Sequence, residues 1–151
     1  LSKVLRFHLK NGINKMFGQI NNLNDYVSFV DHTTSDSSKH ISYFKETCDI
    51  VKEQGMSPER MLTAALGLSA ESGEFTEIVK KVLFQGKPMD EHTRYHMQRE
   101  LGDVMWYVAQ ACIALDTPLD DIINMNISKL EDRYPDGFEV ARSENREEDD
   151  I

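Results

Sequence analysis

The sequence predicts an all-α protein, a four-helix bundle preceded by an extra N-terminal helical segment. Three observations support this prediction. Apolar residues recur every three or four positions along most of the chain, as they do on one face of an α-helix. No stretch of useful length alternates apolar and polar residues in the way a half-exposed strand does. All four prolines lie at the edges of predicted elements, so none interrupts a helical segment.

Length and composition limit the class of protein further. The chain has 151 residues, enough for one domain with a sizeable core, and no apolar run approaches the ~20 residues of a membrane-spanning helix. Acidic residues outnumber Lys plus Arg by 26 to 17, and the net charge of −9 argues against nucleic-acid binding. The two cysteines, Cys48 and Cys112, lack metal-ligand spacing. We therefore expect a reducing, cytoplasmic location.

Two helical segments are expected before the four main helices. Residues 1–21 contain four basic residues and no acid, with apolar residues at helical spacing. We expect them to form a helical N-terminal extension that packs against a partner rather than a membrane. A second short helix is expected to begin near Asn24. The Thr- and Ser-rich stretch 33–38 predicts a loop.

The first two of the four main helices have clear end signals. The first helix is expected over about 42–54, because Gly55 suits a left-handed C-terminal position. Ser57 followed by Pro58 is a typical start, with Ser as the N-cap and Pro as the first helical residue. The second helix then continues to about Phe84, before a connection that contains Gly and Pro.

The other two main helices are bounded in the same way. Asp90 is expected to cap the third helix, which ends near Asp116. Thr117 and Pro118 repeat the cap-then-proline signal and open the fourth helix, which closes near Pro135.

The domain organisation follows from these elements. Residues 22–140 are expected to form one helical domain, whose core includes Trp106. Residues 141–151 are expected to form an acidic C-terminal tail that is mobile or lies against a partner.

Two acidic pairs lie on the second and third main helices. Glu71 and Glu74 are three residues apart, as are Glu100 and Asp103, so each pair projects from one helix face. The short connection around 86–88 makes these helices antiparallel neighbours. If the two faces oppose each other, four carboxylates converge. Because acidic pairs also arise by chance in an acidic chain, ordinary solvated acids are the alternative.

Crowded carboxylates in partly apolar surroundings repel one another unless cations neutralise them. Four carboxylates without a thiolate favour Mg²⁺, with Mn²⁺ as a substitute, over Zn²⁺. A di-iron bundle would need Glu-x-x-His pairs, and none of the five histidines has Glu three residues before it. His92 and His96 are four residues apart, but we expect them to be exposed in the first part of their helix rather than to bind zinc.

The sequence contains no glycine-rich phosphate loop, so phosphate binding would depend on metal and basic side chains. Lys80 and Lys81 follow the first acidic pair, and Lys129 and Arg133 lie on the fourth helix. Asn126 shares a face with the latter two. For any one lysine taken alone, a solvated helix face is the alternative.

Three segments resemble the MazG-like nucleotide pyrophosphohydrolases of the all-α NTP pyrophosphatase superfamily. They are AALGLSAESGE at 64–74, ELGDVMWY at 100–107 and NISKLEDRYPDGF at 126–138. The resemblance covers roughly residues 22–150 and is greatest to the short single-domain members found in phages, including marine ones.

The resemblance implies Mg²⁺-dependent cleavage of a nucleoside triphosphate between the α and β phosphates, which gives the monophosphate and pyrophosphate. The implied metal ligands and catalytic residues are Glu71, Glu74, Glu100 and Asp103. The implied substrate contacts are Lys81, Asn126, Lys129, Arg133 and Tyr134. It also implies a homodimer or homotetramer, located in the host cytoplasm if the chain is phage-encoded.

Two other functions stay open at this point. The chain could hydrolyse another phosphoanhydride, such as an alarmone or a histidine-pathway nucleotide, or it could be a catalytically silent helical module that binds nucleotide or a partner. All four acidic positions are occupied, which favours an enzyme. The proton acceptor would be one of the ligand carboxylates or the additional Glu77.

Overall fold

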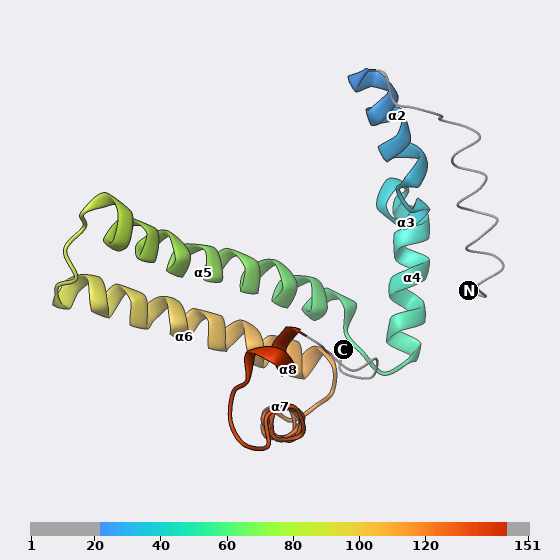
Figure 1. Cartoon of the computed structure of the whole chain (residues 1–151). Coiled ribbons are helices and arrows are strands. Elements are labelled where there is room, and N and C mark those ends of the chain that lie inside the picture. The colour runs from blue at the N-terminus through green and yellow to red at the C-terminus, as the bar shows by residue number, and fades with distance from the viewer. Residues whose placement is uncertain (1–21, 145–151) are drawn as a thin grey trace. The chain divides into compact units, whose positions relative to one another are not determined.

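The structure is a computed structural model that describes residues 22–144. Over this range the chain forms seven α-helices and no strand, which confirms the all-α class (Figure 1). The predictions made for 1–21 and 145–151 lie outside the described residues. The chain's contacts divide it between Asp49 and Ile50 into two units, which are described separately.

The first unit contains α2 (Leu23–Thr33) and most of α4 (Ile41–Glu53). The side chain of Asn22 caps α2 by accepting a hydrogen bond from the Asp25 N–H at 3.0 Å. The end of α4 agrees with the prediction, because Gly55 lies just beyond it with a φ of 83°.

Between these two helices lies α3 (Asp36–Lys39). The loop predicted over 33–38 is therefore wrong in part, since a single helical turn begins within it. Ser35 precedes this turn and its hydroxyl lies 3.0 Å from that of Ser38. Ser and Asp favour helix starts as well as turns, and composition alone does not separate the two.

The second unit is built on α5 (Pro58–Gln85), a helix of 28 residues. The Ser57 side chain caps it by accepting a hydrogen bond from the Arg60 N–H at 3.4 Å, as its sequence predicts. Gly86 ends it with a φ of 73°, in the left-handed region that favours glycine.

The next helix, α6 (Glu91–Ala114), runs antiparallel to α5 and lies beside it (Figure 1). The predicted cap is present, since the Asp90 side chain accepts a hydrogen bond from the Thr93 N–H at 2.8 Å. At the other end of the pair, the N–H of Ser57 donates to the carbonyl of Ala114 at 2.9 Å.

The last two described helices are α7 (Leu119–Arg133) and α8 (Val140–Glu144). The predicted cap by Thr117 is wrong, because its hydroxyl donates to the Leu115 carbonyl at 3.1 Å and Pro118 takes the cap position. The helix α8 includes the first residues of the predicted acidic tail. The limits of the domain stay a prediction.

The α5–α6 pair buries little of its apolar surface. Its buried apolar residues are Ala64, Ile78, Cys112 and Ala114. The expectation that Trp106 packs in the core is wrong, because its side chain is 54% exposed. The main contact of α6 is with α5, and a single neighbouring helix covers only one side of it. The packing of the four main helices as a bundle stays a prediction.

None of the helices in the described part of the chain combines the length and the apolar character needed to cross a membrane.

Candidate metal and nucleotide site

In the register of the α5–α6 pair, two contacts lie on the same side of the acidic residues, toward the start of α5. Gly67 is buried against the ring of Tyr107, and a Cβ at this position would come closer to the ring than the 3.0 Å that real Cβ atoms keep. Nearer the start of α5, Arg60 Nη1 donates to Gln110 Oε1 at 2.6 Å. This register brings one acidic face of α5 opposite one acidic face of α6.

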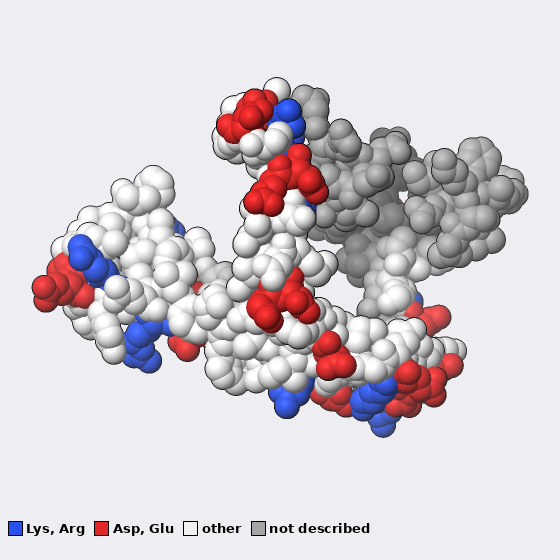
Figure 2. Space-filling view, turned by 90° about the horizontal axis from the view of Figure 1, so that it is seen from below, with Lys and Arg blue, Asp and Glu red and all other residues white. Residues whose placement is uncertain are grey.

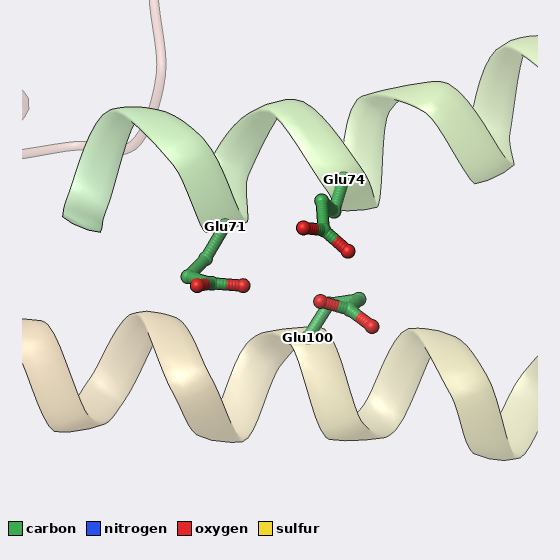
Figure 3. A group of neighbouring side chains, drawn as sticks. All are labelled: Glu71, Glu74 and Glu100. Carbon is green, nitrogen blue, oxygen red and sulfur yellow. The ribbon is translucent and has the colours of Figure 1, made fainter. Parts of the chain in front are cut away.

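Three of the four predicted acids gather between the two helices. Glu71 and Glu74 point from α5 toward Glu100 on α6 (Figure 3). Each offers a carboxylate oxygen, and these oxygens lie within 4.8 Å of one another. Glu100 is only 6% exposed, Glu71 is half-buried and Glu74 is exposed. We call these three residues the carboxylate cluster.

The fourth predicted acid, Asp103, is exposed and is not within the 4.8 Å grouping. Its charge nevertheless acts on the cluster. Burial raises the pKa of Glu71, and the negative charges of Glu74, Asp103 and Glu100 raise it further. A carboxyl group with these neighbours is easier to ionise once a cation is bound beside it.

His96 is a contact of the cluster that the sequence analysis missed. Its Nε2 lies 3.0 Å from Glu100 Oε1, although its side chain remains 43% exposed. The signal was present in the sequence, because the two residues are four apart on one helix. His92 is exposed, as expected.

The carboxylate cluster fits a hard divalent cation. It supplies carboxylate oxygens from two helices. Glu100 is buried and the pKa of Glu71 is raised, and a bound cation would offset the cost of keeping both side chains ionised. Oxygen donors of this kind suit Mg²⁺ or Mn²⁺. The cluster therefore offers the donor set that such a cation requires.

Among the predicted substrate residues, Lys81 lines the same pocket as Glu74. Its Nζ is 3.3 Å from Glu77 Oε1, and Glu77 also pairs with Lys80. Hydrogen bonds from Lys80 and then from Lys81 lower the pKa of Glu77.

The other predicted substrate residues belong to α7 and to the turn after it. Asn126 and Lys129 are exposed, and Arg133 and Tyr134 are partly buried. The Arg133 guanidinium lies 5.9 Å from the centre of the Tyr134 ring, which in turn packs on Phe138 at 5.3 Å. None of them lines the pocket beside Glu74.

On the face shown in Figure 2, the basic side chains of the described residues stand in small, separate groups. A surface that binds a nucleic-acid backbone carries a continuous basic patch or stripe, and this face has none among the described residues.

An all-α chain that gathers carboxylates between two antiparallel helices fits the class of helical nucleotide pyrophosphohydrolases. The model of the MazG nucleotide pyrophosphohydrolase domain matches residues 59–138, more than half of the chain, and the chain belongs to this family. It is thus a hydrolase that acts on phosphoanhydride bonds. The chain is also 37% identical to the "Gene 37 protein" of Mycobacterium phage L5 over 91 residues, which are 60% of this chain and 80% of that protein. No solved structure gives a significant match.

Proposed function

We propose that this protein is a Mg²⁺-dependent pyrophosphohydrolase that cleaves a nucleoside or deoxynucleoside triphosphate between the α and β phosphates. The products are then the monophosphate and pyrophosphate. One observation carries the proposal: Glu71, Glu74 and Glu100 converge from two helices beside a pocket that Lys81 lines. Hydrolysis of a triphosphate is mainly a matter of positioning the phosphates and neutralising their charge.

In this proposal Glu71, Glu74, Glu100 and Asp103 hold the metal. When bound, Mg²⁺ neutralises phosphate charge and lowers the pKa of a bound water. Lys81 contributes a further positive charge at the phosphates. Glu77 is a weak proton acceptor because its two lysine partners lower its pKa, so a carboxylate of the cluster is the better candidate.

The proposal also includes self-association as a homodimer or homotetramer in the cytoplasm, that of the host for a phage protein. The exposed apolar side chains of the α5–α6 pair, among them Leu66 at 65% and Trp106 at 54%, would be covered by a second copy. The proposed substrate contacts of α7 would then reach a site from a neighbouring chain. These are Asn126, Lys129, Arg133 and Tyr134. Light scattering should give the mass of a dimer or tetramer, and a monomer would overturn this part.

The activity can be tested with the eight common nucleoside and deoxynucleoside triphosphates. We expect pyrophosphate and monophosphate to be released in Mg²⁺ and not in the presence of a chelator. Glu100→Gln should abolish turnover, because it removes a buried ligand charge while keeping the side-chain volume. Glu46→Gln is the matched control, since Glu46 is an exposed acid of α4.

The same assay distinguishes the alternatives. Release of diphosphate and inorganic phosphate would mean that a different bond is cleaved. Turnover restricted to an alarmone or a histidine-pathway nucleotide would replace the substrate class. Calorimetric binding of Mg²⁺-nucleotide without turnover of any compound would indicate a silent binding module and refute the proposal.

A further inference from the structure

A pocket continues from the carboxylate cluster toward the connection between α5 and α6. Its polar lining residues are Glu74, Glu77, Lys81, Lys87 and His96. Glu74 also belongs to the cluster, and His96 contacts Glu100. The pocket therefore adjoins the carboxylate cluster through Glu74 and His96. Two lysines also line it, Lys81 from α5 and Lys87 from the connection.

The backbone at the end of α5 brings these two lysines together. Gly86 adopts a φ of 73°, and its N–H donates to the carbonyl of Lys81. The N–H of Lys87 donates to the same carbonyl at 3.1 Å. The chain is thus folded back over the last turn of α5, which places Lys87 close to Lys81 rather than farther along the helix axis.

The two lysines of the pocket differ in their acidic partners. Lys80 and Lys81 share one acid, Glu77. Lys87 is partly buried, and among residues 22–144 no carboxylate forms an ion pair with it. The pocket lining as a whole carries two glutamates and two lysines, and the lysine without an acidic partner among the described residues, Lys87, belongs to the connection.

We infer that Lys81 and Lys87 form the subsite for the terminal, pyrophosphate half of the substrate. The inference rests on the proposed function and adds a direction to it. The α phosphate lies at the carboxylate cluster, and the β and γ phosphates extend along the pocket to the connection. Glu77 retains Lys80 as its partner when Lys81 turns to phosphate. The nucleoside extends the other way, toward the start of α5.

Product inhibition tests this direction, because each product occupies only half of the site. The inhibition constants of inorganic pyrophosphate and of the nucleoside monophosphate are measured at constant free Mg²⁺. Removing a lysine that contacts a phosphate should weaken pyrophosphate binding by roughly tenfold or more. We expect this for Lys81→Gln and for Lys87→Gln, with monophosphate inhibition unchanged within about twofold.

Lys45→Gln is the matched control, since Lys45 is an exposed lysine of α4 that does not line the pocket. It should leave both inhibition constants unchanged, and Lys87→Arg should retain most of the pyrophosphate affinity. Thermal melts of each variant confirm that the fold is intact.

Two results would overturn the inference: wild-type affinity for pyrophosphate in both pocket variants, or an equal loss in Lys45→Gln, which would indicate a general effect of charge. If the wild-type protein releases no pyrophosphate from any triphosphate, the proposed function fails instead. Calorimetry of inorganic pyrophosphate with the wild-type and Lys87→Gln proteins then still decides whether the subsite exists.

Discussion

Replacing Gly67 with alanine tests the packing that holds the site together. Gly67 is buried in α5, directly against the ring of Tyr107 on α6, and a Cβ there would lie less than 3.0 Å from three ring atoms. Non-bonded carbon atoms prefer a separation of about 3.5–4.0 Å. The ring or the helices must therefore move by at least about 0.5–1 Å to admit one methyl group.

The size of the effect follows from two opposing contributions. Overpacking of a well-packed contact costs about 1–3 kcal/mol. Alanine in place of glycine inside a helix stabilises the folded state by about 0.5–1 kcal/mol. We expect Gly67→Ala to lower the free energy of unfolding by about 1–2 kcal/mol, measured by urea denaturation. Because Glu71 lies one turn farther along α5, the same shift should reduce Mg²⁺-dependent turnover.

Gly102→Ala is the control for this substitution. Gly102 is also inside a helix, but a Cβ there meets nothing within 4 Å. It should stabilise the protein by about 0.5–1 kcal/mol. The reasoning is refuted if Gly67→Ala is as stable as Gly102→Ala. A double variant, Gly67→Ala with Tyr107→Leu, should recover part of the lost stability, because the clash has been removed.

Three further predictions concern single groups. Glu100→Gln should abolish the rise in melting temperature that Mg²⁺ produces, while the metal-free protein stays folded because one charge leaves the crowded cluster. The hydrogen bond from the Thr93 N–H lowers the pKa of Asp90, so its stabilising effect is present above the ordinary carboxyl pKa and is lost as the pH falls through the lowered value. Thermal melts of Asp90→Asn at decreasing pH should lack this loss of stability. Equal pH profiles of melting temperature for the wild-type and variant proteins would contradict the prediction. Arg60→Ala should reduce stability by roughly 0.5–1 kcal/mol without changing turnover, since it removes the bond to Gln110, and a loss of turnover would contradict this.

Local chemistry explains which parts of the fold could be predicted. Ser57, Asp90, Gly55 and Gly86 bound the helices where the sequence places them, because capping depends on neighbours within one turn. The exposure of Trp106 could not be predicted, since it depends on which other helix covers that side of α6. Periodicity shows that a face is apolar and does not say what covers it.

The site illustrates the same limit. Spacing of three residues predicts that each acidic pair shares one helix face, and Glu71 and Glu74 both face Glu100. It did not fix how far one helix is shifted along the other, which depends on the contact between Gly67 and Tyr107. As a result Glu71, Glu74 and Glu100 converge, whereas Asp103 lies outside the group and acts on Glu71 only through its charge.

The choice between a metal site and ordinary surface acids depends on what keeps the carboxylates together. Solvated acids on a flexible surface turn away from one another, because repulsion is relieved at little cost. Here Glu100 is buried between the helices, and the close approach of α5 to α6 leaves Glu71 and Glu74 facing it. The fold therefore keeps like charges close together, and their repulsion adds to the effect of burial in raising the pKa of Glu71. A divalent cation would remove that repulsion and at the same time attract the phosphates of a nucleotide, so in the proposed function one arrangement of acids serves both metal and substrate.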